Sequence, residues 1–357
     1  MLIGRRSAIP SQVIDPVRGM GHRGAHARGS AVIQVGFAGT FAATLVPRVR
    51  AHLDLPCDVV ATDEASIVAR LPAVDVLVTM AFTPAMGAAA RRLKLVQVPG
   101  AGLDRIDRAA LPADAWLANV YGHETGIAEY VIGAMLARTR DFTRLDAALR
   151  RGTWESQWAV GPPPPAPWPE LAGRTLGIVG YGRIGQALAR RARAFDMQVL
   201  AIRRDVAQSA ADGLDRLGGL EILDEVLGRA DYLVLTLPLT RDTRGLIGEA
   251  QLRRMKPTSV LVNVSRAEIV DERALYEALA GQRLGGAALD VWYRYPTDTA
   301  PTLPARQPFH ELTNVLMTPH VSGWTDGMLE ARAQLIAQNI ARASRGEPPL
   351  NLISPTV

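Results

Sequence analysis

Cysteine is almost absent from this sequence: Cys57 is the only one among 357 residues. A single cysteine excludes an internal disulfide and makes a reducing compartment, the cytoplasm, the expected location. Long apolar runs are missing too, and no stretch reaches the roughly 20 residues that a membrane-spanning helix needs. We therefore expect no association with a membrane.

The first 30 residues lack the apolar centre of a secretory signal. They are basic and rich in small residues, and the pair Arg5 and Arg6 is too little to form an export signal. We expect residues 1–30 to be a disordered extension, or the result of an over-long start with Met20 as the true first residue.

A segregated basic stripe is also lacking, although the net charge is +5. A positive charge can indicate nucleic-acid binding. Here arginines and acids alternate, as in DRIDRAALPAD (104–114), which is typical of solvated helix faces. No nucleic-acid partner is expected, and no metal site.

Apolar strand patterns that alternate with helical patterns are present in two runs. The first covers about 31–120 and the second begins near residue 174. Strands alternating with helices predict parallel sheets covered on both faces, and hence two α/β domains. The expected strands lie at 31–37, 74–80, 94–99, 176–179, 232–238, 259–265 and 285–291.

Between the two runs lie a helical pattern and a proline-rich stretch. Residues 125–152 predict one long amphipathic helix that ends at Gly152. Four consecutive prolines at 162–165 exclude helix and sheet interior and predict a stiff arm or connection. A last helical pattern from about residue 325 has no strand of its own, so we expect it to pack on an earlier domain.

A glycine-rich turn opens the second run. Gly180, Gly182 and Gly185 follow an apolar strand and precede a helical pattern. In this spacing the first glycine permits a tight turn, the second lets the backbone approach a pyrophosphate, and the third lets helix and strand pack closely. The helix N-terminus offers its N–H groups to phosphates. The context favours a dinucleotide-binding domain over a plain strand-to-helix turn.

The acid that an NAD site places at the end of the next strand is missing. Arg203 and Arg204 stand there, and the first acid is Asp205. A carboxylate binds the ribose 2′-hydroxyl of NAD, whereas arginine holds a 2′-phosphate bidentately and stacks on adenine. A single arginine would not decide between a phosphate contact and a solvated strand end; the pair favours NADP, with NAD as the alternative.

Five further stretches follow one another in the order and spacing of a known family: GAGLDRID (100–107), HETGIAEYV (123–131), VNVSRAEIVDE (262–272), GAALDVWYRYP (286–296) and NVLMTPHVSG (314–323). With the glycine turn, they resemble the D-isomer-specific 2-hydroxyacid dehydrogenases over about residues 70–345. This family includes phosphoglycerate, glyoxylate/hydroxypyruvate, D-lactate and formate dehydrogenases. The resemblance implies hydride transfer between NAD(P)H and a 2-oxo acid or D-2-hydroxy acid.

The resemblance also implies an architecture of two Rossmann-like domains with a cleft between them. The expected substrate domain is flavodoxin-like and comprises residues 31–125 plus 322–350. The expected dinucleotide-binding domain is a doubly wound parallel sheet of residues 126–321. The helical stretch 125–152 and the proline-rich arm resemble the dimerisation elements of the family, so we expect a homodimer.

Two residues match the catalytic groups of the family. Reduction of a 2-oxo acid needs a cation for the carboxylate, polarisation of the carbonyl and a proton donor. Arg266 directly follows an apolar strand, where a guanidinium can clamp a carboxylate and polarise the adjacent carbonyl. By resemblance it is the catalytic arginine, and His320 is the acid/base histidine, a role that its near-neutral pKa suits.

Other positions carry over from the family as binding residues. Ala101 and Gly102 match the backbone N–H groups aimed at the substrate carboxylate. Phe82 and His123 lie in loops that the family points at the substrate, so they are our candidates for specificity. The positions that match cofactor contacts are Arg183, Ile184, Leu237, Pro238, Thr243, Val264 and Asp290, the last of them near the nicotinamide carboxamide.

The glutamate that usually partners the histidine is missing. Tyr295 occupies its position in DVWYRYP. A phenol can orient an imidazole but does not stabilise imidazolium as a carboxylate does. A substitute partner, if there is one, is sought among Glu124, His310 and Glu311.

This departure keeps two alternatives open. Formate dehydrogenases also lack the glutamate and share the Ser322-Gly323 pair, and formate oxidation needs no base; they carry asparagine, however, where His123 stands. A non-catalytic, nucleotide-sensing corepressor is the other alternative. The intact Arg266 and His320 argue against it.

Overall fold

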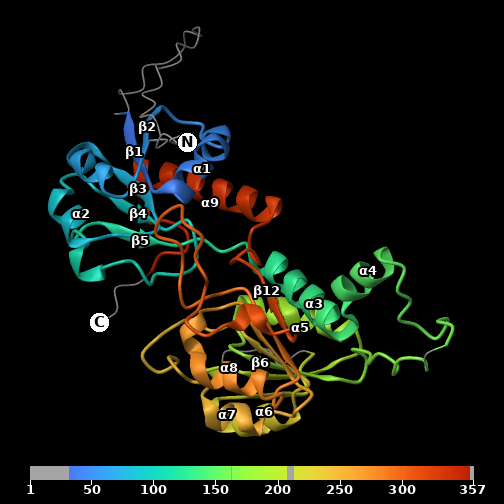
Figure 1. Ribbon diagram of the computed structural model, residues 1–357. Coiled ribbons are helices and arrows are strands. Elements are labelled where there is room, and N and C mark those ends of the chain that lie inside the picture. The colour runs from blue at the N-terminus through green and yellow to red at the C-terminus, as the bar shows by residue number, and fades with distance from the viewer. Residues whose placement is uncertain (1–31, 162, 207–212, 354–357) are drawn as a thin grey trace. The chain divides into compact units, whose positions relative to one another are not determined.

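The structure is a computed structural model, and it describes residues 32–161, 163–206 and 213–353. The extension expected at residues 1–30 lies outside these ranges. The chain forms two compact units (Figure 1). Unit 1 consists of the described parts of 1–122 and 326–357, and unit 2 of the described parts of 123–325.

Unit 1 is built on a parallel five-stranded sheet in the order β2-β1-β3-β4-β5. This order is that of flavodoxin-like folds, in which ligands bind at the carboxyl ends of the strands. The strands are β1 (Ile33–Ala38), β2 (Cys57–Thr62), β3 (Val76–Thr79), β4 (Leu95–Gln97) and β5 (Trp116–Ala118).

Helices cover both faces of this sheet, which is why β1 and β3 read as almost continuous apolar runs. On one face α1 and α9 pack together, with Leu45 and Ile340 in their shared core. The other face carries α2 and short 3-10 turns, with Met86 in the core. The helical elements are α1 (Thr40–Ala51), η1 (Ser66–Ala69), η2 (Leu71–Ala73), α2 (Pro84–Ala89), η3 (Arg108–Ala110) and α9 (Asp326–Ser344).

Unit 2 is built on a parallel seven-stranded sheet in the order β12-β11-β10-β9-β6-β7-β8. Numbered from β6, six of these strands follow the 3-2-1-4-5-6 order of a dinucleotide-binding domain, and β12 extends it. The expected fold class of two parallel α/β domains is confirmed. The strands are β6 (Thr175–Val179), β7 (Gln198–Ile202), β8 (Arg216–Gly218), β9 (Tyr232–Leu235), β10 (Val260–Asn263), β11 (Gly286–Leu289) and β12 (Val315–Met317).

Helices again cover both faces of the sheet. One face packs against α3 and α5, and the other against α6, α7 and α8. The helical elements of unit 2 are α3 (Glu124–Arg140), α4 (Phe142–Arg150), α5 (Arg183–Arg193), η5 (Leu220–Ile222), α6 (Leu223–Arg229), α7 (Glu249–Arg254), η6 (Ala267–Ile269), α8 (Glu272–Ala280) and η7 (Phe309–Glu311).

The expectation of one helix over 125–152 is wrong. Asp141 adopts a left-handed conformation (φ 49°) and separates α3 from α4. Its N–H still bonds the carbonyl of Ala137, so α3 ends there and the chain turns into a second helix. The apolar periodicity of the sequence runs through this break. In the structure, however, Phe142 and Leu149 on α4 are exposed and do not continue the buried stripe of α3.

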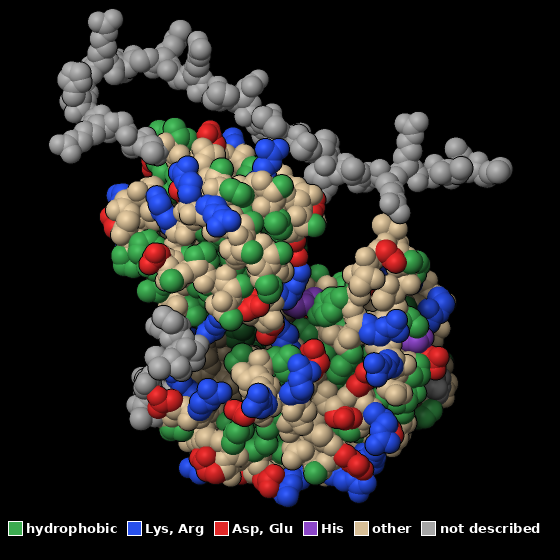
Figure 2. All heavy atoms as spheres, turned by 90° about the vertical axis from the view of Figure 1, so that its left-hand side faces the viewer, with side chains coloured by type: hydrophobic (Ala, Val, Ile, Leu, Met, Phe, Trp, Pro, Cys, Tyr) green, Lys and Arg blue, Asp and Glu red, His purple; other side chains and the backbone are tan. Residues whose placement is uncertain are grey.

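Among the helices of the described ranges, none combines the length and apolar character that crossing a bilayer requires. On the face shown in Figure 2, basic and acidic side chains are interspersed and form no single basic field. This mixing agrees with the alternating charges of the sequence.

Candidate active site

The glycine turn joins β6 to α5 in unit 2. Gly180 has φ 106°, and a Cβ there would lie 2.8 Å from the backbone of Thr236 and Leu237. A Cβ on Gly185 would lie 2.8 Å from the carbonyl oxygen of Gly180, so only glycine lets α5 start this close to the strand. A Cβ on Gly182 would meet open space. The residues therefore fit a dinucleotide, whose pyrophosphate needs a bare backbone beside a helix N-terminus.

The arginine pair adjoins this turn. The N–H groups of Gly180 and Tyr181 both donate to the carbonyl of Ile202, at 3.0 and 2.8 Å, so the end of β7 is fastened to the turn. Arg203 follows at once; its N–H bonds Gly218 in β8 at 2.9 Å, and Arg204 and Asp205 are exposed. Two guanidinium groups thus lie at the strand end where an NAD site has its acid.

The loop after β9 is fixed by its own threonines. The Thr243 hydroxyl donates to the carbonyl of Pro238 at 2.7 Å and accepts the N–H of Thr240 at 2.7 Å. The Thr236 hydroxyl bonds the carbonyl of Gly180 at 2.7 Å and joins this loop to the glycine turn. Leu237 and Pro238 are thereby held beside the turn. The Thr243 hydroxyl stabilises this loop from within. Ile184 is in the first turn of α5, and Val264 is buried after β10.

Arg266 follows β10 in an extended conformation. The buried side chain of Asn263 donates to the Arg266 carbonyl at 2.9 Å and accepts the N–H of Ser265 at 3.0 Å. The Ser265 hydroxyl in turn bonds the carbonyl of Leu235 in β9. The backbone that carries the guanidinium is therefore held rigidly by the core of the sheet.

His320 and Tyr295 form a hydrogen-bonded pair. The Tyr295 hydroxyl lies 2.8 Å from Nδ1 of His320 and accepts the N–H of Trp292 at 3.3 Å. We assign the hydroxyl as donor to Nδ1 of the neutral ring, which places the ring proton on Nε2, the nitrogen that the acid/base role uses. Tyr295, at the position where the resemblance implies a glutamate, is thus hydrogen-bonded to His320.

The pKa of His320 is lowered from its ordinary value. The main cause is burial of the ring against protein atoms, although the outer edge of the residue is exposed. Asp290 raises this pKa and Arg266 lowers it further. Burial also raises the pKa of Tyr295, so the phenol stays neutral at physiological pH.

Asp290 anchors the loop that carries His320. Its carboxylate is fully buried and accepts the Thr318 hydroxyl at 2.6 Å and the N–H groups of Val321 and Ser322 at 2.8 Å each. These residues flank His320 on both sides and hold it at φ 58°, a left-handed conformation that is uncommon for residues other than glycine. Three hydrogen bonds to one buried carboxylate thus fix the histidine backbone.

Tyr130, to which the sequence motifs assign no role, completes this anchor. Tyr130 on α3 lies 2.6 Å from the Thr318 hydroxyl and, because Thr318 donates to Asp290, Tyr130 is the donor. Burial raises the pKa of Tyr130 to about 12. Trp292 adds a bond from its indole N–H to the Thr318 carbonyl at 2.8 Å. Sequence reasoning missed this role of Tyr130, since a tyrosine in a helical apolar pattern reads as a core residue.

The other candidate partners, Glu124, His310 and Glu311, are not among the groups that shift the pKa of His320. Glu311, in η7, pairs with its neighbour His310 at 3.8 Å. Glu124 is the first residue of α3. The charged groups that act on His320 are Asp290 and Arg266, and its ring nitrogen is hydrogen-bonded to Tyr295.

The specificity candidates are both buried. Phe82 is 1% exposed, and its ring packs in the core of unit 1, where it anchors the loop that carries it. His123 is buried at the start of α3, next to Gly323. In unit 1, Ala101 and Gly102 lie in the loop that follows β4. Within the described ranges no cluster of three or more His, Cys, Asp or Glu side chains could hold a metal ion.

Comparison with known proteins extends this picture. The family model described as D-isomer specific 2-hydroxyacid dehydrogenase, NAD binding domain, matches residues 132–322. A glyoxylate reductase of Korarchaeum cryptofilum is 35% identical over 316 residues, which cover 86% of this chain and 90% of that protein. A glyoxylate reductase of Pyrococcus furiosus is 36% identical over 272 residues, covering 75% of this chain and 78% of that protein.

Solved structures of the same family superpose on this chain. A D-isomer specific 2-hydroxyacid dehydrogenase family protein from Aeromonas salmonicida has a TM-score of 0.75 at 28% identity, covering 91% of this chain and 99% of that one. An NADPH-dependent glyoxylate/hydroxypyruvate reductase from Sinorhizobium meliloti, in complex with NADP and sulfate, has a TM-score of 0.73 at 27% identity, covering 90% and 98%. The resemblance carried by the motifs is confirmed: this chain belongs to the D-isomer-specific 2-hydroxyacid dehydrogenases and is an NAD(P)-dependent oxidoreductase acting on CH–OH donors.

Proposed function

We propose that this enzyme reduces a small 2-oxo acid of the glyoxylate class to the corresponding D-2-hydroxy acid, with NADPH as the preferred cofactor. It catalyses the reverse reaction when the concentrations of 2-hydroxy acid and oxidised cofactor favour oxidation. The observation that carries the proposal is the Tyr295–His320 hydrogen bond, which holds an acid/base imidazole on an anchored loop. The glyoxylate reductases among the relatives support the substrate class.

The residues of unit 2 divide the chemistry between them. The bound nicotinamide cofactor supplies the hydride. Arg266 binds the substrate carboxylate and polarises the adjacent carbonyl, because a guanidinium is a fixed, permanent cation with paired donors. His320 in its imidazolium form donates its Nε2 proton to the alkoxide that forms. Tyr295 keeps Nε2 directed outward by holding Nδ1, in either protonation state of the ring.

The preference for NADPH rests on Arg203 and Arg204. Both follow β7, which is fastened to the glycine turn through Ile202. A 2′-phosphate there gains charge-assisted hydrogen bonds that a 2′-hydroxyl does not provide. Related structures that contain NADPH or NADP agree with this assignment.

The homodimer is proposed on the exposed apolar surface of α4 and the arm that follows it, which projects from unit 2 in Figure 1. Phe142, Leu149, Trp154 and Trp158 are all more than half exposed there. A cluster of large apolar side chains of this kind marks an interface. Light scattering on the purified protein tests the oligomeric state, and Trp158→Glu should give monomers.

One assay panel tests the function. Glyoxylate, hydroxypyruvate and bulkier 2-oxo acids are each offered with NADPH and with NADH, and formate is offered with NADP⁺ and NAD⁺. Reduction of glyoxylate to glycolate, or of hydroxypyruvate to D-glycerate, supports the proposal. Formate oxidation without oxo-acid reduction would replace it with the formate-oxidising alternative, and cofactor binding without any turnover would support the nucleotide-sensing alternative.

A further inference from the structure

The C-terminal segment of unit 1 extends the sheet beyond its outer strand. After α9 the chain returns to β5, where Leu352 forms an antiparallel bridge with Ala118. The N–H of Ile353 bonds the carbonyl of Leu117 at 2.8 Å, and the N–H of Asn119 bonds the carbonyl of Asn351 at 3.4 Å. The segment 350–353 therefore covers the edge of β5, directly before Asn119.

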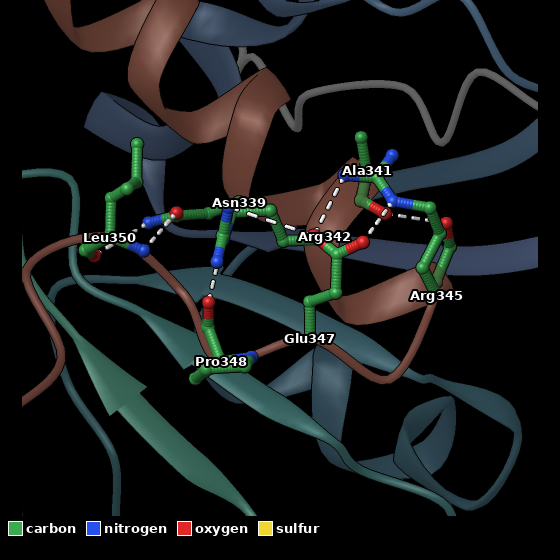
Figure 3. Close-up of polar contacts among 8 residues, drawn as sticks. Asn339, Ala341, Arg342, Arg345, Glu347, Pro348 and Leu350 are labelled. Carbon is green, nitrogen blue, oxygen red and sulfur yellow. Dashed lines mark hydrogen bonds and ion pairs between the residues drawn. The ribbon is translucent and has the colours of Figure 1, made fainter.

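Asn339 on α9 anchors this segment (Figure 3). Its Oδ1 accepts the N–H of Leu350 at 2.7 Å, and its Nδ2 donates to the carbonyl of Leu350 at 3.1 Å. Nδ2 also donates to Oε1 of Gln97 at 2.6 Å. Asn339 and Gln97 are fully buried, and Gln97 donates onward to the carbonyls of Val98 and Ala118. A satisfied buried amide network of this kind fixes one geometry.

Asn119 connects this edge to the loop after β4. Its side chain is 3% exposed, and Nδ2 donates to the carbonyl of Ala101 at 3.1 Å. The next N–H, that of Val120, donates to the carbonyl of Gly100 at 3.2 Å. Two consecutive carbonyls of the loop thus point at residues 119–120.

Because the peptide bond is planar, anchoring the carbonyls of Gly100 and Ala101 also fixes the direction of the N–H groups of Ala101 and Gly102. In a trans peptide the N–H points opposite to the C=O of the same unit. The Gly100 carbonyl shares its peptide unit with the Ala101 N–H, and the Ala101 carbonyl shares its unit with the Gly102 N–H. Both N–H groups are therefore aimed away from β5, and no hydrogen bond within the described residues engages either of them. Two adjacent outward N–H groups form an anion-binding concavity.

We propose that Asn119 is a positioning residue that aims the N–H groups of Ala101 and Gly102 at the substrate carboxylate, and that the segment 350–353 holds Asn119 in place. The proposal rests on the proposed function, because that function supplies the carboxylate. Asn119 acts through the Ala101–Gly102 peptide unit and touches no reacting atom.

The test measures carboxylate binding apart from turnover, on the full-length enzyme. Oxalate is titrated into the enzyme–NADPH complex, and KM and kcat for glyoxylate are measured alongside. Asn119→Leu removes the amide at nearly constant volume. It should raise the oxalate Kd and the glyoxylate KM about tenfold, the effect of roughly one lost hydrogen bond, while kcat stays within about threefold. NADPH affinity should not change, since the glycine turn belongs to unit 2.

A matched control separates positioning from general destabilisation. Asn314→Leu removes the same kind of bond, from Nδ2 to the Leu279 carbonyl at 3.1 Å, and should leave KM and the oxalate Kd unchanged. Asn351→Gly is the milder test, because φ 54° suits glycine and only the contact with Asn119 is lost. It should raise KM about two- to threefold and keeps the question answerable if Asn119→Leu does not fold.

The outcomes separate the two proposals. Weaker oxalate binding in both variants supports the inference, even if the wild type reduces another substrate. Normal glyoxylate turnover with unchanged oxalate affinity and KM in both variants overturns the inference and leaves the function intact. A wild-type enzyme that neither reduces 2-oxo acids nor binds oxalate overturns both.

Discussion

The hydroxyl of Tyr295 lies 2.8 Å from Nδ1 of His320, within hydrogen-bonding distance of the ring. The phenol preserves the direction of the hydrogen bond but carries no charge. The pKa of His320 is consequently set by burial and Arg266, which lower it, against Asp290, which raises it. Tyr295 therefore orients the imidazole without supplying a negative charge that would raise its pKa.

The first prediction concerns the pH dependence of reduction. The active form carries His320 as imidazolium, so kcat/KM for oxo-acid reduction should fall as pH rises through the lowered pKa of His320. Tyr295→Glu adds a negative charge within hydrogen-bonding reach, which raises that pKa and should move the descending limb upward by roughly a unit or more. Rate profiles of wild type and variant, with chemistry shown to be rate-limiting, provide the measurement.

Tyr295→Phe is the control for this experiment. It removes the hydrogen bond without adding charge, so the limb should not move upward although the rate falls. A Tyr295→Glu profile that coincides with the wild type would mean that the side chain at position 295 does not govern the protonation of His320.

A second prediction isolates the substrate clamp. Arg266→Ala should lower kcat/KM for glyoxylate by about two to three orders of magnitude or more, because the variant loses both carboxylate binding and carbonyl polarisation. NADPH binding, followed by protein fluorescence, should stay within about twofold. Arg266→Lys should recover only part of the activity, since an ammonium lacks the planar pair of donors. Near-normal turnover of Arg266→Ala would place the clamp elsewhere.

The third prediction concerns the Thr318 hydroxyl, which acts on catalysis indirectly. It donates to Asp290 and so helps to anchor the loop that carries His320. Thr318→Val keeps the shape of the side chain but removes the bond to Asp290 and the acceptor for Tyr130. Because His320 then loses part of its anchor, we expect kcat to fall by about tenfold and the free energy of unfolding by about 1 kcal/mol. Thr313→Val, at an exposed position before the same strand, is the matched control. Equal kcat values for the two variants would contradict the anchoring role.

The strands could be predicted from the sequence where their apolar composition reflects burial in the centre of a sheet. The apolar strands at 176–179, 232–238 and 259–265 have close counterparts in β6, β9 and β10. Their sides are covered by helices, so apolar residues run almost without interruption. The edge strands β2, β5, β8 and β12 were not predicted. Residues on β2 and β8 are half-exposed, and their mixed composition resembles that of loops.

The site could be predicted from the sequence only for positions to which the family resemblance assigns a role. The motifs predict the roles of Arg266, His320 and Tyr295. They also predict the contact between Tyr295 and His320, because Tyr295 stands at the position of the glutamate that usually partners the histidine. Tyr130 and Asn119 were not found, because each acts on a residue far away in the sequence through one hydrogen bond. Asp141 shows the converse limit: a left-handed residue interrupts an apolar period that predicts a continuous helix.

The close approach of α5 to the glycine turn predicts opposite effects of the same mutation at two glycines. Gly185→Ala forces a Cβ to 2.8 Å from the Gly180 carbonyl oxygen and should cost about 1–3 kcal/mol of unfolding free energy. Gly228→Ala, on the exposed side of α6 with nothing within 4 Å, should add about 0.5–1 kcal/mol. Chemical denaturation of both variants provides the comparison. Equal effects would contradict the tight packing at Gly185.

The last prediction concerns cofactor choice. We expect kcat/KM to favour NADPH over NADH, and Arg203→Asp to reverse the preference, because a carboxylate at this strand end repels a 2′-phosphate and accepts a hydrogen bond from a 2′-hydroxyl. Arg253→Asp makes the same change in net charge on α7, where Arg253 pairs with Glu249, and should leave the preference unchanged. Initial rates with both cofactors at saturating glyoxylate give the ratios for the three proteins. An NADH preference of tenfold or more in the wild type, equivalent to about 1.4 kcal/mol, would refute the role assigned to the arginine pair. A preference that survives Arg203→Asp would transfer that role to Arg204.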